Sequence, residues 1–378
     1  MRQDKPLVAL IANGGIDHTG THRANLYQIK AFLELDGFAV HVFWIRLQAD
    51  MQKLVRALHS HSYHFVHCEQ GHYLGLAMDG ELLFDKLELP VFTQLRDHWF
   101  YPWVWRNLKS LPNKATIFHT SELYAQVASR VNGSHVHTVH TSQLYKKRET
   151  DYLARPINIF YSGTCRSIAD ATSMASERLE GTAIERIVDE CAEACRIPDW
   201  VWEIEFLGDD RVRVGDLELD LPDYYRFFEL ARSIVRSNIL NVLAKHDATM
   251  FVKGGWTPVK DAKASFSNKP ISFPESNFLA SHSACVFSDQ ATFRNEIGER
   301  VATGLEIGTR VIARANTGLA QYVSQGKNLL VYDSLESLSD VLDACSGMTL
   351  EKSDLPNRPN FGIQRYIGDI YDTLDGGS

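Results

Sequence analysis

The chain alternates short apolar segments with helical ones, and this alternation restricts its fold more than any other feature. The stretch "PLVALIANGG" (residues 6–15) is typical of a buried strand that ends in glycines, and "FAVHVFWI" (38–45) is typical of a second buried strand. Between them, residues 21–37 place apolar side chains at helical spacing and end in a glycine. A strand, a helix and another strand in this order form the unit from which parallel sheets are built.

The same alternation continues to the end of the chain. Further strands are predicted at residues 64–69, 90–98, 115–121, 135–140, 157–163, 201–209, 248–255, 284–289, 309–316 and 328–333. Near-continuous apolar strands between helices favour a mostly parallel sheet that is covered on both faces. We therefore predict an α/β protein with two Rossmann-like, doubly wound domains that face each other across a cleft.

A polar segment at residues 142–156 interrupts the alternation and predicts the domain boundary. We place an N-terminal domain at residues 1–150 and a C-terminal domain at residues 151–358. The last helical segment, within 359–378, is predicted to pack back on the first domain. A length of 378 residues agrees with two domains.

Two segments of the second domain depart from the strand–helix rhythm. Residues 208–223 alternate with period two, which predicts a short hairpin insertion. Residues 257–276 have no clear periodicity, and we predict a long loop there, either a lid or a platform for a substrate.

Composition and charge argue against several classes of protein, namely nucleic-acid binders, membrane-surface binders and zinc-site proteins. The 39 basic and 47 acidic residues give a formal charge of -8, which argues against a nucleic-acid or membrane-surface binder. The six cysteines are scattered, and Cys191 and Cys195 have a spacing that suits one helix face better than a zinc site. With no run of membrane-spanning length and no signal-peptide pattern at the start, we expect a cytoplasmic protein, either free or peripheral to a membrane.

In a parallel sheet, ligands bind at the loops that follow the carboxyl ends of the strands, and the first such loop spans residues 13–23. Gly14 and Gly15 permit a close approach of the backbone to an anionic ligand, and His18 is a candidate catalytic base. In the alternative, the glycines form only a turn, and His18 or Thr19 caps the helix. The spacing does not match a G-x-G-x-x-G fingerprint, so no dinucleotide cofactor is predicted.

The second candidate loop spans residues 94–103. Asp97 is a candidate general base or ligand for a sugar hydroxyl, and the aromatic side chains that follow it can stack on a sugar. In the alternative, Asp97 is a helix N-cap, and Trp99, Phe100 and Trp103 belong to the core.

The third candidate loop, "YSGTCR" (161–166), follows the first strand of the second domain. Its Ser162, Gly163 and Thr164 supply small polar groups and backbone amides, and Arg166 supplies a positive charge. These residues predict a phosphate-binding loop, and the alternative is a simple turn between a strand and a loop.

The fourth candidate combines two predicted helix starts, one at Asn295 or Glu296 and one at residues 316–318. Helix N-termini carry partial positive charge and unpaired amides, so two of them aimed at one point make a diphosphate-binding site. Arg300 is predicted one turn inside its helix, and its alternative partner is Glu296 in a solvated pair. The candidate diphosphate-binding residues in this part of the chain are Lys253, Asn295, Glu296, Arg300, Asn316, Thr317 and Gly318.

Residues 283–345 resemble the C-terminal domain of GT-B glycosyltransferases, in particular the spore-maturation (CgeB-like) branch and the group 1 glycosyltransferase families. That pattern has an arginine eight residues before a helix-ending glycine, here Arg300 and Gly308, followed by a β-branched strand and a small-residue turn. The segment "QGKNLLVYDSLESL" (325–338) fits the continuation, and "INIFYSGT" (157–164) resembles the strand that opens the same domain.

The sequence departs from this family at one point. Many retaining members carry two glutamates eight residues apart, and the corresponding positions here are Asn295 and Thr303. Glu299 and Glu306 are seven residues apart and out of register. The stereochemistry of the reaction is therefore left open.

The resemblance implies a glycosyltransferase that moves a sugar from a nucleoside-diphosphate donor, UDP- or GDP-linked, to a glycan, protein or small-molecule acceptor. The donor would lie on the second domain, and the acceptor on the first, with Asp97 or His18 as the base if the reaction inverts. No obligatory metal and no other cofactor are expected, because Asp209 and Asp210 lie in a predicted turn rather than in a D-x-D site. The alternatives are a nucleotide-sugar epimerase or hydrolase and a non-catalytic nucleotide- or glycan-binding protein.

Overall fold

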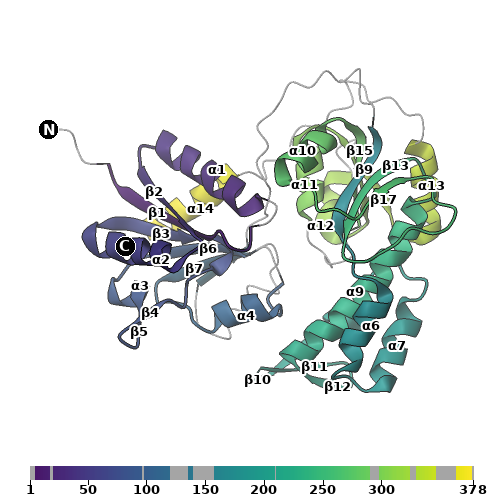
Figure 1. Cartoon of the computed structure of the whole chain (residues 1–378), viewed down its shortest axis with the longest axis horizontal. Coiled ribbons are helices and arrows are strands. Elements are labelled where there is room, and N and C mark those ends of the chain that lie inside the picture. The colour runs from purple at the N-terminus through teal and green to yellow at the C-terminus, as the bar shows by residue number, and fades with distance from the viewer. Residues whose placement is uncertain are drawn as a thin grey trace. The chain divides into compact units, whose positions relative to one another are not determined.

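The computed structural model describes residues 5–17, 20–95, 98–119, 135–138, 157–208, 210–289, 298–323, 329–345 and 363–376. The chain divides into two compact units (Figure 1). The first combines Met1–Leu144 with Asn360–Ser378, and the second is Tyr145–Pro359. The predicted boundary between residues 150 and 151 lies outside the described residues.

The first unit is built on a parallel sheet with helices on both faces. Its elements are β1 (Leu7–Asn13), α1 (Thr21–Leu35), β2 (Ala39–Ile45), α2 (Gln48–Ser60), β3 (Tyr63–Cys68), η1 (Glu69–Gly71), β4 (Ala77–Met78), β5 (Glu81–Leu82), α3 (Leu83–Lys86), β6 (Val91–Leu95), α4 (Pro102–Leu108), β7 (Ala115–His119), β8 (His135–Thr138) and α14 (Ile363–Gly376). Within the described residues, the sheet has the order β2-β1-β3-β6-β7-β8, and its neighbouring strands are parallel.

Strand β1 shows why this sheet is covered on both sides. Its side chains alternate between faces, so Val8 and Leu10 pack in a cluster with α1, whereas Ala9 and Ile11 pack in a cluster with α2 and α3. All four side chains are fully buried. The continuous apolar run that predicts a two-sided strand therefore reflects two separate cores.

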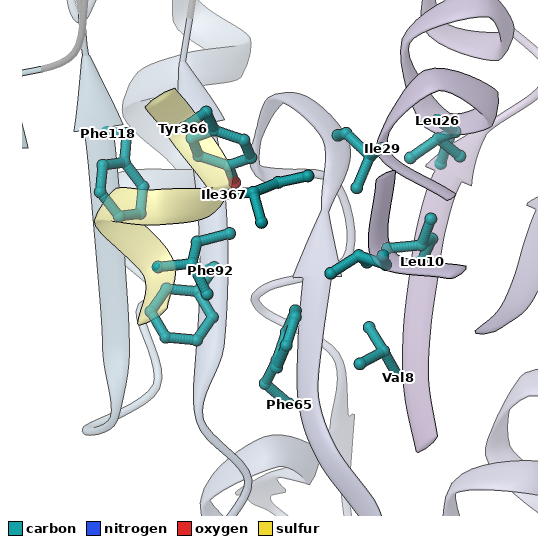
Figure 2. Packing of buried hydrophobic residues seen from close by; sticks show 12 residues of the cluster. Val8, Leu10, Leu26, Ile29, Phe65, Phe92, Phe118, Tyr366 and Ile367 are labelled. Atoms are coloured by element: carbon teal, nitrogen blue, oxygen red, sulfur yellow. The ribbon is translucent and has the colours of Figure 1, made fainter. Parts of the chain in front are cut away.

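Helix α14 comes from the far end of the chain and completes the core of the first unit. Figure 2 shows Tyr366 and Ile367 beside Phe92 and Phe118, which lie on the neighbouring strands β6 and β7. The rings of Tyr366 and Phe118 meet edge to face with centroids 5.0 Å apart. Helix α14 thus packs against the first sheet.

The second unit repeats the parallel architecture. Its elements are β9 (Ile157–Thr164), α6 (Ile168–Ser176), α7 (Gly181–Cys191), α8 (Asp199–Trp202), β10 (Ile204–Gly208), β11 (Arg211–Val214), β12 (Leu217–Asp220), α9 (Leu221–Leu243), β13 (Ala248–Lys253), β14 (Ser265–Ser267), α10 (Phe273–Ser281), β15 (Ser283–Ser288), α11 (Glu299–Glu306), β16 (Arg310–Arg314), α12 (Thr317–Val323), β17 (Leu329–Tyr332) and α13 (Leu335–Cys345). In the part of the chain that the structure describes, its main sheet has the order β14-β13-β9-β15-β16-β17, with parallel neighbours.

The strand order of each sheet reverses at one point. In the first sheet, β2 lies on one side of β1, and the strands from β3 onward lie on the other side, so the order reverses between β1 and β3. In the second sheet, β13 and β14 lie on one side of β9, and β15, β16 and β17 lie on the other, so the order reverses between β9 and β15. Loops leave the carboxyl ends of such strands in opposite directions, which opens a crevice where ligands bind in doubly wound folds. The two reversal points therefore locate the candidate sites.

Two predictions for the second unit are wrong. Residues 201–209 were expected to join the parallel sheet, but β10 pairs antiparallel with β11, which pairs with β12 in a small separate sheet. The predicted hairpin within 208–223 is therefore present as β11 and β12, with β10 added to it. Residues 257–276 are not one long loop, because they contain edge strand β14 and the start of α10.

Candidate functional site

A buried carboxylate lies at the reversal point of the second sheet, directly after β15. The side chain of Asp289 is 1% exposed, and its Oδ1 accepts hydrogen bonds from Nε and Nη2 of Arg236 on α9, at 3.0 and 2.8 Å. The hydroxyl of Tyr161 on β9 donates to Oδ2 at 2.8 Å. Arg236 also donates to the carbonyl of Thr164. These contacts tie β9, α9 and the end of β15 together at the carboxyl edge.

Arg300 is the second guanidinium at this carboxylate. Its Nη1 lies 3.6 Å from Oδ2 of Asp289, and its guanidinium lies over the ring of Tyr161 at 5.4 Å from the centroid. Unlike Arg236, whose side chain is 7% exposed, Arg300 keeps 36% of its side chain exposed. One arginine is thus structural, and the other is anchored on one side and accessible on the other.

Two arginines and one tyrosine surround the carboxylate of Asp289 in the described part of the chain. Burial and the neighbouring Asp289 raise the pKa of Tyr161, so its hydroxyl stays neutral. Burial lowers the pKa of Arg236, but the attraction and hydrogen bonds of Asp289, together with the nearby Tyr161 and Cys165, raise it by more, so the net shift is upward. Among the described residues, the carboxylate of Asp289 therefore faces two guanidinium groups, and the guanidinium of Arg300 is the more exposed of the two.

Gly163 makes room for this arrangement. A methyl group on its Cα would lie 2.4 Å from the hydroxyl of Tyr161 and 3.1 Å from Nη2 of Arg300. The structure therefore brings together Gly163 and Arg300, two predicted site residues that are far apart in the sequence. Their partners Asp289 and Arg236 were not predicted.

The loops after β9 and β13 are joined through their backbones. The amide of Cys165 donates to the carbonyl of Lys253 at 2.7 Å, and the amide of Ser167 donates to Gly254 at 3.1 Å. Gly254 has a φ of 116°, and a Cβ there would lie 2.7 Å from the carbonyl of Cys165. This close approach explains the glycine pair in "FVKGGW" and brings the end of β13, which carries Lys253, beside the loop that carries Arg166.

The other predicted residues of the β9 loop have local partners. The hydroxyl of Ser162 lies 3.2 Å from that of Ser276 on α10, and the side chain of Thr164 is exposed. The N-cap of α6 is Ser167, whose hydroxyl accepts from the amide of Asp170. The nearest helix start thus already has an internal cap, and a phosphate-binding role for this loop remains a prediction.

The helix starts near the end of the chain differ in part from the prediction. Helix α11 begins at Glu299 with Gly298 as its N-cap, so Arg300 lies in its first turn rather than one turn inside. Asn295 and Glu296 lie outside the described residues. Asn316 caps α12 by accepting from the amide of Leu319 at 2.9 Å, which leaves the diphosphate role of Asn316, Thr317 and Gly318 as a prediction.

In the first unit, the glycines after β1 make a tight turn. The amide of Gly14 donates to Ile45 at 2.8 Å, and a Cβ on Gly14 would overlap the indole of Trp44. The carboxylate of Asp17 accepts from the amides of residues 22 and 23 at the start of α1. Asp17 therefore caps two amides of α1 and places a negative charge where an anionic ligand was expected, whereas His18 and Thr19 lie outside the described residues.

The catalytic candidates His18 and Asp97 lie outside the described residues. Trp99 and Phe100 are each 1% exposed and belong to the core, so a sugar-stacking role is wrong for them. Trp103 is 42% exposed and its ring lies 4.7 Å from that of Tyr101, so stacking remains a prediction for Trp103 alone.

A polar cluster that the sequence interpretation missed lies at the reversal point of the first sheet. Glu69, directly after β3, is fully buried, and its Oε1 accepts from Nδ2 of Asn25 at 3.2 Å and lies 3.4 Å from Nδ1 of His22. Its Oε2 lies 3.3 Å from Nε2 of His67, whose Nδ1 lies 2.7 Å from the hydroxyl of Tyr366 on α14. The signal in the sequence was a charged residue that ends an apolar strand.

The backbone that carries Glu69 is held in an uncommon conformation. Gln70 has a φ of 55° although it is not glycine, and Gly71 follows with a φ of 70°. Thr93 on β6 fixes this turn, because its hydroxyl donates to the carbonyl of Cys68 at 2.6 Å and accepts from the amide of Gly71 at 2.7 Å. The turn directs both Glu69 and His72 to the same edge of the sheet.

His72 gives the first unit a predicted pH dependence. Burial, aided by the nearby His22 and opposed by Glu69, lowers the pKa of His72 from 6.5 to about 4. The unfolded chain therefore binds more protons between pH 6.5 and 4, and the fold loses stability as the pH falls through this window, by at most about 3 kcal/mol. We expect His72→Gln to flatten the curve of unfolding free energy against pH in this window, which chemical denaturation at several pH values measures. An equally steep curve in the variant would contradict this assignment.

Among the described residues, no group of histidine, cysteine and acidic side chains has the arrangement of a metal site. Likewise, no helix in that part of the chain is long and apolar enough to cross a membrane. Asp210 lies in the turn between β10 and β11 with a φ of 63°.

No family model and no curated protein matches the sequence. Solved structures do match. A glycosyltransferase from Rickettsia africae ESF-5 superimposes with a TM-score of 0.51 over 100% of both chains, at 10% identity. An alpha-glucosyltransferase in complex with UDP and a 13-mer DNA containing an HMU base superimposes with a TM-score of 0.51 over 98% of this chain and 100% of that chain, at 9% identity. The chain therefore has the GT-B fold, with two Rossmann-like units in one polypeptide.

Proposed function

We propose that the protein is a glycosyltransferase that transfers a sugar from a nucleoside-diphosphate donor bound to its second unit. The acceptor, a glycan, a protein or a small molecule, is assigned to the first unit. The resemblance to the spore-maturation branch supports the same class of activity. Independence from a metal ion remains part of this proposal.

One observation carries the proposal. Arg236 and Arg300 share the carboxylate of Asp289 at the reversal point of the second sheet, and Arg300 remains accessible. A guanidinium that is fixed on one side and exposed on the other can donate two parallel hydrogen bonds to a phosphate with little loss of side-chain entropy. The geometry therefore favours an anion at Arg300.

The positive charge of Arg300 can assist the departure of the diphosphate. As the bond between the sugar and the diphosphate breaks, negative charge grows on the departing oxygen, and Arg300 neutralises it. Arg236 and Asp289 keep the guanidinium in place, so little reorganisation is needed in the transition state. Lys253, Arg166 and residues 316–318 are proposed as further contacts to the same diphosphate.

The nucleotide is proposed to be UDP or GDP. The alpha-glucosyltransferase of the same fold contains UDP, which supports UDP as the first choice. A few side chains around the donor determine which sugar the protein accepts. Asp97 and His18 stay as predicted catalytic residues on the acceptor side.

Thermal unfolding in the presence of nucleoside diphosphates and nucleotide sugars tests the proposal. A ligand present at 100 times its Kd stabilises the fold by about 2.7 kcal/mol. We expect UDP or GDP to raise the melting temperature of the wild type, and Arg300→Ala to abolish the shift because the diphosphate loses its main cation.

Arg211→Ala is the matched control, because Arg211 is an exposed arginine on β11 with 50% of its side chain accessible. This variant should keep the full shift. If no nucleotide stabilises the wild type, the donor site is wrong and the non-catalytic alternative gains support. If Arg300→Ala keeps the shift, the nucleotide binds elsewhere.

A further inference from the structure

We propose that Tyr161 is a positioning residue for Arg300: it keeps the guanidinium near Asp289 without a direct hydrogen bond between the two, so that Arg300 stays available to the diphosphate. This role rests on the proposed glycosyltransferase function and adds to it a residue that acts through Arg300 rather than on the substrate. All the groups concerned belong to the second unit.

Tyr161 reaches the carboxyl edge of the sheet because of its place in β9. Side chains of a strand alternate between the two faces, so Phe160 packs with Ala280 of α10 on one face, and Tyr161 lies on the other. Its hydroxyl extends over Gly163, two residues further along the same face, where a Cβ would lie only 2.4 Å from the hydroxyl oxygen. The glycine therefore leaves the space that the hydroxyl occupies.

The hydroxyl of Tyr161 occupies one oxygen of the carboxylate that Arg300 approaches. It donates to Oδ2 of Asp289 at 2.8 Å. Burial and the negative charge of Asp289 raise the pKa of Tyr161, so the proton stays on its hydroxyl at neutral pH. The other oxygen, Oδ1, accepts from Nε and Nη2 of Arg236. Both oxygens of the carboxylate therefore accept hydrogen bonds from groups other than Arg300.

Arg300 lies close to this carboxylate but outside hydrogen-bond distance. Its Nη1 is 3.6 Å from Oδ2 of Asp289, whereas an N–H···O hydrogen bond spans about 2.7–3.2 Å. By contrast, Nη2 of Arg236 lies 2.8 Å from Oδ1. The same carboxylate thus hydrogen-bonds one arginine and only attracts the other, and this attraction does not use the N–H groups of Arg300.

The ring of Tyr161 supplies a second contact to the guanidinium. The central carbon of the Arg300 guanidinium lies 5.4 Å from the centroid of the ring, which is within the range of a cation–π contact. Attraction to a ring requires no hydrogen-bond acceptor, so it leaves the N–H groups of the arginine for an anion. Because the tyrosine is fully buried, its ring is held in place and limits the positions that the guanidinium can take.

These contacts explain how an arginine beside a carboxylate can still bind a phosphate. In a direct two-bond pair with Asp289, Arg300 would present fewer N–H groups to a diphosphate, and the diphosphate would have to compete with the carboxylate for them. With Tyr161 on Oδ2, the arginine is oriented by attraction and by the ring alone. An incoming diphosphate then meets a guanidinium that is already in position, which lowers the cost of binding.

Replacement of Tyr161 by phenylalanine separates the two parts of this role, because it keeps the ring and removes the hydroxyl. We expect Oδ2 of Asp289 to pair directly with Arg300 in this variant. The Kd for UDP or GDP, measured by isothermal titration calorimetry, should then rise by about 10-fold. Tyr161→Leu, which also removes the ring, should raise the Kd at least as much. Arg300→Ala, titrated alongside, shows whether the nucleotide binds at this arginine.

Tyr224→Phe is the matched control. Tyr224 on α9 is also fully buried, and its hydroxyl donates to the carbonyl of Val201 at 2.9 Å. Chemical denaturation should show a loss of stability in both phenylalanine variants, whereas the Kd should change only in Tyr161→Phe. If Tyr161→Leu does not fold, Tyr161→Phe still decides, because it keeps the shape of the core. An equal Kd in the two phenylalanine variants would contradict the proposal.

Spectra of the arginine side chain test the mechanism without a nucleotide. In ¹H–¹⁵N spectra of the ¹⁵N-arginine-labelled full chain, the guanidinium signal that Arg300→Lys removes belongs to Arg300. We expect this signal to move downfield in Tyr161→Phe, because its protons then hydrogen-bond to Asp289, and to lose its ring-current shift in Tyr161→Leu. A tyrosine that only fills the core would leave the Arg300 signal unchanged in Tyr161→Phe.

The outcomes separate this proposal from the function on which it rests. If neither UDP nor GDP binds the wild type, or if Arg300→Ala binds them equally well, the proposed donor site fails, and the role of Tyr161 fails with it. If a nucleotide binds through Arg300 and Tyr161→Phe binds it as tightly as the wild type, the donor site stands and Tyr161 is not a positioning residue. The same holds if the Kd rises but the Arg300 signal does not move, because the effect would then not pass through Arg300.

Discussion

Replacing Asp289 by alanine is expected to lower the free energy of unfolding by about 3–5 kcal/mol and to abolish nucleotide binding. The reason is that the buried guanidinium of Arg236 would lose its counter-charge. Tyr161 would lose its acceptor as well, and a buried donor without a partner adds to the cost. Arg300 would lose the carboxylate that holds it over Tyr161, so the accessible cation would no longer be fixed.

Chemical denaturation measures the first effect, and the nucleotide thermal shift measures the second. Glu218→Ala is the matched control, because Glu218 also accepts from two arginines, Arg211 and Arg213, but on the exposed small sheet. Solvent screens that pair, so the control should change stability little and nucleotide binding not at all. If Asp289→Ala is as stable as this control, the buried charge cluster does not hold the second unit together.

The general fold can be predicted from the sequence because buried parallel strands leave a strong signal. Strands such as β1 and β15 are apolar on both faces, so their positions follow from hydrophobicity alone. Strand β10 is a different case. It has no residue with a fully buried side chain and pairs in a small antiparallel sheet, and an apolar run does not reveal which sheet a strand joins.

The segment 257–276 was misinterpreted for a related reason. Strand β14 has three residues, Ser265–Ser267, and it is stabilised by pairing with β13 along one edge rather than by burial. Such a strand has no periodicity to detect. Its position follows only from the tertiary structure.

Only part of the cluster around Asp289 could be named from the sequence, and its role in binding a ligand stays a prediction. Gly163 and Arg300 were found because a glycine after a strand and an arginine near a helix start have local signatures. Arg236 was missed because its role depends on Asp289, 53 residues away, and within α9 it resembles any other helical residue. Glu69 was missed for the same reason, because its partners lie on α1 and β3, and the chain of contacts extends to Tyr366 on α14.

Truncation of the chain after Pro359 is expected to destabilise the first unit strongly, because it removes α14. Tyr366, Ile367 and Ile370 are 2%, 3% and 1% exposed within the core that covers one face of the first sheet (Figure 2). Loss of one large core side chain costs about 2–5 kcal/mol, and loss of three approaches or exceeds the total stability of a typical domain, about 5–15 kcal/mol. We therefore expect the truncated chain to lose the cooperative unfolding of the first unit, whereas the second unit keeps its own core.

Differential scanning calorimetry tests this expectation by following the heat absorbed by each unit. Two point variants on the same helix show whether the effect comes from burial. Ile370→Ala should cost about 2–5 kcal/mol, because it leaves a cavity against the sheet. Tyr371→Phe removes only the exposed hydrogen bond to Asp36 and should cost far less. A truncated chain with an intact first transition would mean that α14 lies on the first unit without stabilising it, and the Tyr366–His67–Glu69 chain of hydrogen bonds would then lose its fixed end.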